Sequence, residues 1–165
     1  PREAELAAIA GYLHDVGNIV NRHAHAHSGA LMAWIILQRL GLPIEEIVQV
    51  VAAIGNHDEG DGEVVSAITA AVMLADKSDV GRSRVRNPDI STFDEHDRVN
   101  YAVEQMALHT DVADRTITLR LTVDPATSVA ADYFELFLSR MLMCRRAARF
   151  LGCEFQFEIN RTRIF

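Results

Sequence analysis

Cysteine, proline and tryptophan are scarce in this chain, and it has no long hydrophobic run. Its 165 residues include two cysteines, four prolines and one tryptophan. Cys144 and Cys153 form neither a CxxC motif nor a disulfide framework, so we expect reduced thiols. No apolar run approaches the roughly 18 residues of a membrane span, and no segment resembles a signal peptide. The sequence therefore predicts a cytoplasmic protein that does not enter a membrane.

Basic residues are fewer than acidic ones. The chain has 16 Lys and Arg against 23 Asp and Glu, a formal net charge of -7 at pH 7. This balance argues against a broad nucleic-acid-binding surface, which needs a basic face. A small anionic substrate stays compatible with it, because bound cations or a local arginine cluster can dominate a small site. With 49% hydrophobic residues, the chain can form a globular domain with a real core.

Helical periodicity dominates the first part of the sequence. Apolar residues recur at three-and-four spacing over residues 3–15, and further helices are expected after Gly29, over 43–54 and over 64–75. Residues 80–91 lack periodicity, which predicts a long loop. A fifth helix should begin at residue 94 or 95, with Val103 and Met106 on its apolar face.

The period changes after residue 111. Residues 116–123 and 153–160 alternate between apolar and polar, which predicts two strands, with Phe155 and Phe157 in the core. Between them, Pro125 and Ser128 introduce a long helix. We therefore expect a mainly α fold, with a helical bundle over residues 1–110 and a small β-α-β (α+β) element over 111–165. That element would pack on the same core or form a homodimer interface.

Residues that can bind metal collect at the predicted helix ends. They are His14, Asp15, His25, His57 and Asp76. A helical bundle can gather such side chains from separate helices into one cavity. Mixed imidazole and carboxylate ligands suit one or two divalent ions of Mn, Fe, Ni, Co or Zn, and the carboxylates also suit Mg.

Four segments resemble, in order, the motifs of the HD superfamily of metal-dependent phosphohydrolases. Residues 13–17 (Leu-His-Asp-Val-Gly) resemble its signature motif. Residues 25–30 (His-Ala-His-Ser-Gly-Ala) and 54–59 (Ile-Gly-Asn-His-Asp-Glu) are similar to segments of a subgroup with extra ligands, as in HD-GYP proteins. Residues 74–79 (Leu-Ala-Asp-Lys-Ser-Asp) resemble the closing aspartate motif. The similarity covers roughly residues 3–108.

The resemblance implies a helical fold and a set of metal ligands. His14, Asp15 and Asp76 would hold one ion, with Asp15 bridging to a second ion held by His25 and His57. Two further residues are possible ligands. His27 would replace His25 if the register of the histidine-rich segment differs by two residues. Asp58 stands where the subgroup has a second His, and it could bind through a carboxylate oxygen.

The resemblance also implies roles in the reaction. Asp15 would orient or deprotonate the attacking water, and Lys77 and Asp79 could transfer protons or stabilise charge. Asn18 occupies the position where nucleotidase-like members carry Glu and cyclic-dinucleotide phosphodiesterases carry Lys, so the resemblance would place it near the substrate but assigns neither substrate class. Guanidinium groups make bidentate contacts to phosphate oxygens. Three arginines follow Asp76 closely enough to do so: Arg82, Arg84 and Arg86.

The expected function is hydrolysis of a phosphomonoester or phosphodiester by metal-activated water. The substrate would be a small phosphorylated or nucleotide-like molecule. Two alternatives stay open at this point. One is a catalytically degenerate regulatory or nucleotide-binding module, and the other is a di-iron oxygenase-type enzyme, since related helical scaffolds can use iron for oxidation.

Overall fold

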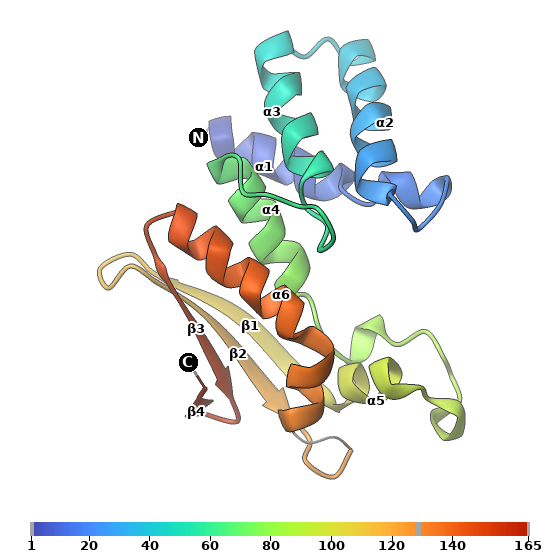
Figure 1. Ribbon diagram of the computed structural model, residues 1–165, viewed down its shortest axis with the longest axis vertical. Helices are drawn as coiled ribbons and strands as arrows, with labels where there is room; N and C mark the ends of the chain where they lie inside the picture. Colours follow the sequence, from blue (N-terminus) through green and yellow to red (C-terminus); the bar gives the residue numbers. More distant parts are fainter. Residues whose placement is uncertain (1, 128–129, 165) are drawn as a thin grey trace. The chain divides into compact units, whose positions relative to one another are not determined.

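The computed structural model describes residues 2–127 and 130–164, and its contacts divide the chain into two compact units (Figure 1). The first unit is Pro1–Asp76 and the second is Lys77–Phe165. None of the helices in the described part of the chain has the length and apolar character that a bilayer crossing requires.

The first unit is helical. Its elements are α1 (Arg2–Leu13), the 3-10 turn η1 (Val16–Ile19), α2 (His25–Arg39), α3 (Ile44–Gly55) and the greater part of α4 (Ala67–Ser78). α3 packs against both α1 and α2, while η1 packs against α2. Gly41, with a φ of 77°, allows the tight turn between α2 and α3.

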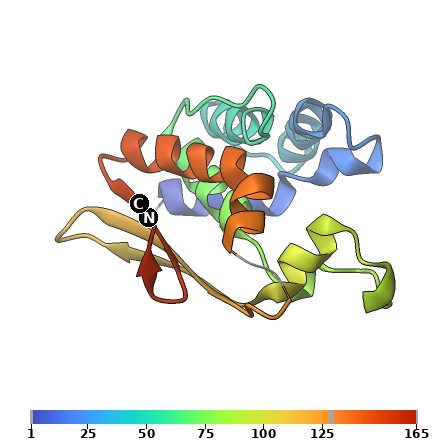
Figure 2. The ribbon, with the colours of Figure 1, turned by 60° about the horizontal axis from the view of Figure 1, so that its bottom comes forward.

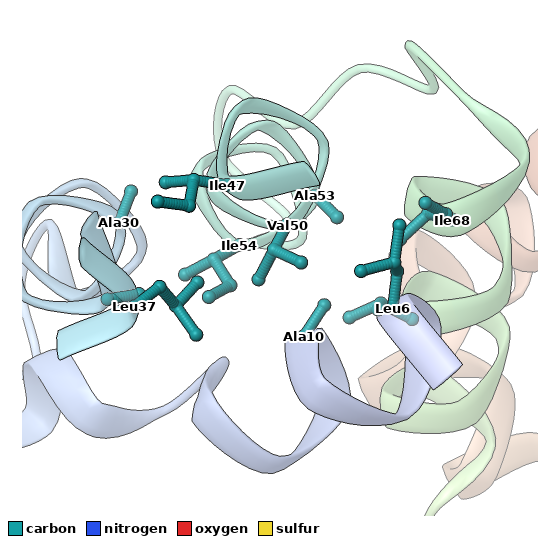
Figure 3. Packing of buried hydrophobic residues seen from close by; sticks show 11 residues of the cluster. Leu6, Ala10, Ala30, Leu37, Ile47, Val50, Ala53, Ile54 and Ile68 are labelled. Carbon is teal, nitrogen blue, oxygen red and sulfur yellow. The ribbon is translucent and has the colours of Figure 1, made fainter. Parts of the chain in front are cut away.

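One hydrophobic core holds these helices together. Figure 3 shows apolar side chains of all four helices meeting in it. Those that are less than 3% exposed include Leu6, Ala10, Leu37, Ile47, Val50, Ile54 and Ile68. The ends of α1 and α3 are therefore fixed relative to α2, and the polar residues at those ends are fixed with them.

The second unit joins irregular segments to a four-stranded sheet. It contains η2 (Arg82–Arg84), η3 (Ile90–Thr92), α5 (Glu95–Ala102), β1 (Val103–Asp111), β2 (Thr116–Val123), α6 (Ala130–Phe150), β3 (Glu154–Ile159) and β4 (Thr162–Arg163). The strand order is β1-β2-β3-β4. β2 and β3 are parallel, and the other two pairs are antiparallel. The predicted fold class, mainly α with a C-terminal β-α-β element, is confirmed.

The sheet has two strands more than the sequence predicted. The fifth helix ends at Ala102, and Val103 and Met106 belong to β1 instead of to its apolar face. Met106 pairs with Leu121 of β2 in an antiparallel hairpin. The prediction was wrong because strand pairing, which depends on a neighbouring segment, overrides a local helical spacing.

The second and the long sixth helix begin as follows. The second helix begins at His25, ahead of Gly29, and Ala24 precedes it in a left-handed conformation with a φ of 56°. Ser128, at the expected start of the long helix, lies outside the described residues, and α6 begins at Ala130.

α6 packs across one face of the sheet (Figure 2). Tyr133 of α6 stacks on Phe157 of β3 with ring centroids 5.3 Å apart, and Phe137 lies 5.0 Å from the Tyr133 ring. Phe155 and Phe157 are at most 3% exposed, which confirms their predicted place in the core.

Tyr133 offers a test of this packing. Its side chain is 1% exposed, and among the described residues its Oη has no hydrogen-bond partner. Burial accordingly raises the pKa of the phenol. We expect Tyr133→Phe to raise the free energy of unfolding by about 1 kcal/mol, because an unsatisfied buried hydroxyl is removed. Urea denaturation measures this change, and Tyr12→Phe, at a residue 89% exposed, is the neutral control. A less stable Tyr133→Phe protein would contradict the packing.

Candidate metal centre

Three histidines and two aspartates from separate segments meet in the first unit. His14 and Asp15 follow the end of α1, and His25 is the first residue of α2. His57 comes two residues after α3, and Asp76 lies near the end of α4. All five residues were predicted metal ligands, and the helix ends bring them together.

The three imidazoles are held in the same way. In each, Nδ1 lies within hydrogen-bond distance of the backbone carbonyl three residues earlier in the chain. The contacts are His14 to Gly11 at 2.6 Å, His25 to Arg22 at 3.0 Å and His57 to Ile54 at 2.6 Å. A carbonyl oxygen only accepts, so Nδ1 carries the proton and the Nε2 lone pair is left for another partner. This is the arrangement of metal-binding histidines, whose second nitrogen is commonly fixed by a carbonyl or carboxylate.

The Nε2 atoms of His25 and His57 lie 3.1 Å apart. With both Nδ1 atoms donating to carbonyls, two lone pairs face each other at this distance unless a proton or a cation lies between them. Ligands about 2.0–2.2 Å from one ion are at most about 4.4 Å apart. The separation is therefore short enough for both nitrogens to bind a single metal ion.

Asp15 directs its two carboxylate oxygens at different imidazoles. Oδ1 lies 3.3 Å from Nε2 of His25 and 3.9 Å from Nε2 of His57. Oδ2 lies 3.7 Å from Nε2 of His14. The same Nε2 atom of His14 is also 3.6 Å from Oδ1 of Asp76. Asp15 thus lies between two sets of ligand atoms.

The ligand atoms form two overlapping groups. One contains His14, His57 and Asp76, and the other contains Asp15, His25 and His57, with all atoms of a group within 4.8 Å of one another. The resemblance placed His57 with the second ion alone, whereas in the structure His57 belongs to both groups. The chemistry and spacing of these donors fit a divalent transition-metal ion.

One side of the cluster is closed and the other is open. The His25 and His57 side chains are 3% and 1% exposed, whereas the Asp15 side chain is 45% exposed. Asp15 is the most exposed of the five residues, so a small molecule can reach the cluster from its side. Arg22, a residue that the sequence did not single out, lies at this opening with Nη1 3.9 Å from Oδ1 of Asp15. The one sequence signal for it is its position three residues before His25.

Gly17 explains how the turn after Asp15 approaches α2. A Cβ atom at this position would lie 2.0 Å from the carbonyl oxygen of His25 and 2.6 Å from the amide nitrogen of Gly29. Only glycine allows η1 to contact the first turn of α2 at this distance. The glycine of the signature motif thereby places Asp15 beside His25.

The remaining predicted residues of the first unit lie apart from this cluster. His27 is exposed and Asp58 is half-buried, and both line a separate cavity of about 230 Å³. Neither belongs to a group of described residues that could hold a metal ion, whereas His25 does. Asn18 is exposed in η1.

The other predicted residues belong to the second unit. Lys77 is buried at the end of α4, and Arg86 is exposed. Arg84 forms an ion pair of 2.9 Å with Asp79. The guanidinium of Arg82 lies 4.3 Å from the centre of the Tyr101 ring. Their roles in a reaction remain predictions.

Protons should compete with metal at this cluster. The Asp76 carboxylate raises the pKa of the His14 imidazole in the metal-free protein. Metal binds only the deprotonated ring, so affinity should increase with pH, and the increase should extend above the ordinary His pKa of about 6.5. We expect a gain of at least about tenfold per pH unit below that value, because binding displaces at least one proton.

Calorimetric titration with Zn²⁺ at pH 5.5, 6.5 and 7.5 would measure this dependence. The His14→Gln variant, which lacks the titrating ring, should show a weaker dependence. Equal affinity of the unaltered protein at all three pH values would contradict the expected role of the imidazoles.

The comparison with known proteins agrees with the site. Residues 1–81 match the family model of the HD domain, a range that contains all five residues of the cluster. No curated protein and no solved structure matches the chain. The superfamily consists mostly of metal-dependent hydrolases, and its members bind divalent metals. The match, together with the helical fold and the ligand cluster, supports the assignment of residues 1–81 to the HD superfamily.

Proposed function

We propose that the chain hydrolyses a phosphate ester with metal-activated water, at a centre formed by His14, Asp15, His25, His57 and Asp76. The observation that carries the proposal is the common orientation of three imidazoles. Each has its Nδ1 proton held by a backbone carbonyl, and each directs Nε2 at a carboxylate. Mixed sets of this kind suit Mn, Fe, Ni, Co or Zn, while Mg would depend on the carboxylates.

The geometry supports a centre for two ions. His14 and Asp76 would hold the first ion, and His25 and His57 would hold the second. Asp15 would contribute carboxylate oxygen to both, since its two oxygens are nearest to different imidazoles. This division is the one found in the subgroup with extra ligands, to which we propose the chain is similar.

When bound, a divalent metal ion supplies a water molecule of lowered pKa and polarises the phosphoryl group. The protein contributes orientation and access. Asp15 is half-exposed at the opening, where its carboxylate can accept a hydrogen bond from the attacking water. Arg22 at the same opening can donate to phosphoryl oxygens. The buried rings of His25 and His57 exclude solvent from the opposite side.

We propose a small phosphorylated or nucleotide-like substrate in the cytoplasm. Lys77 and Asp79 stay candidates for proton transfer, and Arg82 and Arg86 for substrate contacts. Arg84 is the weaker candidate, because phosphate would compete with the Asp79 carboxylate to which it is paired. Asn18 is exposed and follows Asp15 by three residues in the sequence, so it stays a candidate for contact with the substrate.

Metal-dependent turnover tests the proposal. Protein treated with a chelator and reconstituted separately with Mn²⁺, Co²⁺ and Zn²⁺ would be assayed on p-nitrophenyl phosphate, bis(p-nitrophenyl) phosphate and a set of nucleotides. We expect hydrolysis of at least one ester only with added metal. His57→Gln should lose about 100-fold or more, since a ligand is removed. His109→Gln, at an exposed residue of β1, is the matched control and should keep full activity.

Two outcomes would contradict the proposal. One is hydrolysis that persists without metal or in His57→Gln. The other is metal binding with no turnover of any ester, which would favour a regulatory or nucleotide-binding module.

A further inference from the structure

The second unit has a cavity of about 410 Å³ at the C-terminal end of α6. The residues that line it are Arg145 and Arg149 of α6, Cys153, and Glu154 and Phe155 of β3. A smaller hollow of about 230 Å³ is lined by the same two arginines together with Leu142 and Arg146. Arg145 and Arg149 therefore line both hollows.

The positive charge of this cavity is not compensated. Among the described residues, Arg145, Arg146 and Arg149 have no ion-pair partner. The carboxylate that lines the cavity, Glu154, lies 2.7 Å from Arg163 and is thereby neutralised. Residues 136–153 contain four arginines and neither Asp nor Glu. A surplus of positive charge thus lies at a cavity in a chain whose net charge is -7.

Helix stability alone does not explain this arrangement. Basic residues near a helix C-terminus interact favourably with the helix dipole. Arg145 and Arg149 are four positions apart on one helix, however, and like charges at that spacing repel each other. An acidic residue elsewhere on the same turn would relieve the repulsion, and none is present in this segment. A bound anion would relieve it instead.

We propose that this cavity binds a small anion with at least two negative charges, of the phosphate-ester or pyrophosphate class. Guanidinium groups bind phosphate oxygens in bidentate fashion. Cβ atoms four residues apart on a helix are about 6 Å apart, so the two groups can contact neighbouring phosphoryl groups of one ligand. The site belongs to the unit Lys77–Phe165 and contains none of the metal ligands, so it does not depend on the proposed hydrolysis.

Titration of the full chain with inorganic pyrophosphate tests this site. The protein is treated with a chelator, and binding is followed by ¹H–¹⁵N amide shifts. We expect saturable shifts at Arg145, Arg149, Cys153 and Glu154. Arg149→Gln should weaken binding at least tenfold, whereas Arg39→Gln removes an equal charge from an exposed position of α2 and should change it less than twofold.

The same titration of the His57→Gln variant distinguishes this cavity from the metal centre. We expect that variant to bind pyrophosphate with the affinity of the unaltered protein. Thermal unfolding of each variant checks that it folds, which we expect of Arg39→Gln and Arg149→Gln because both residues are exposed. Three results would overturn the proposal. They are equal weakening by Arg39→Gln and Arg149→Gln, shifts confined to the residues around His14 and His25, and no saturable binding at millimolar pyrophosphate.

Discussion

The Asp15→Asn protein is expected to lose metal-dependent turnover by about 100- to 1,000-fold. The Asp15 carboxylate is within 3.3–3.9 Å of the Nε2 atoms of all three histidines. The amide keeps the shape of the side chain but removes its charge and replaces one oxygen with an NH₂ group, which cannot bind metal. With a single oxygen left, the side chain can no longer serve both proposed ion positions, and both lose the neutralising negative charge. Turnover under saturating metal, together with metal content by elemental analysis, measures the effect.

Asp114→Asn is the matched control for this substitution. Asp114 is exposed in the β1–β2 turn and lies outside the cluster, so its replacement should leave turnover unchanged. An Asp15→Asn protein that retained normal metal content and normal turnover would exclude the proposed centre.

Replacement of Gly17 with alanine is expected to destabilise the fold by about 3 kcal/mol, at the upper end of the usual cost of overpacking. The added Cβ would lie 2.0 Å from the carbonyl oxygen of His25 and 2.6 Å from the amide nitrogen of Gly29. Both are backbone atoms of α2, so η1 and the first turn of α2 would have to separate. Because His25 belongs to that turn, its Nε2 would also move away from Asp15 and metal affinity should fall.

Urea denaturation and a metal titration measure the two effects. Gly11→Ala is the control, because a Cβ there has no atom within 4 Å, and alanine is favoured over glycine within a helix by about 0.5–1 kcal/mol. We expect that variant to be slightly more stable than the unaltered protein. Unchanged stability and metal affinity in Gly17→Ala would show that the close approach of η1 and α2 is unimportant.

Periodicity sufficed for the elements whose apolar faces are locally visible. The helices that contain Leu6, Ile54 and Phe137, and the strands that contain Leu119 and Phe157, lie where the apolar spacing predicted them. β1 was missed because Val99, Ala102, Val103 and Met106 also satisfy a helical spacing. Its strand conformation depends on pairing with β2, which a local pattern does not contain.

The start of α2 decided which histidine joins the cluster. Its N-cap residue is Ala24, whose side chain cannot cap a helix, so the usual sequence signal for the start was absent. With the helix beginning at His25, residues 25 and 27 lie on different faces because successive residues are about 100° apart. His25 is accordingly buried in the cluster and His27 is exposed.

Arg22 could not be found from the sequence for a related reason. Its guanidinium lies near Asp15, and its carbonyl contacts the ring of His25 through the backbone, a contact that does not depend on the type of side chain. That the five residues His14, Asp15, His25, His57 and Asp76 come together could be predicted, since each stands near a helix end in a motif of recognisable order.

Elemental analysis of the purified chain, before and after reconstitution with Mn, Fe, Ni, Co or Zn, tests the metal centre most directly. One or two divalent ions per chain are predicted, and an Asp15→Asn/His57→Gln double variant should retain none. A chain that binds none of these metals, or a double variant with the metal content of the unaltered protein, would contradict the centre formed by His14, Asp15, His25, His57 and Asp76.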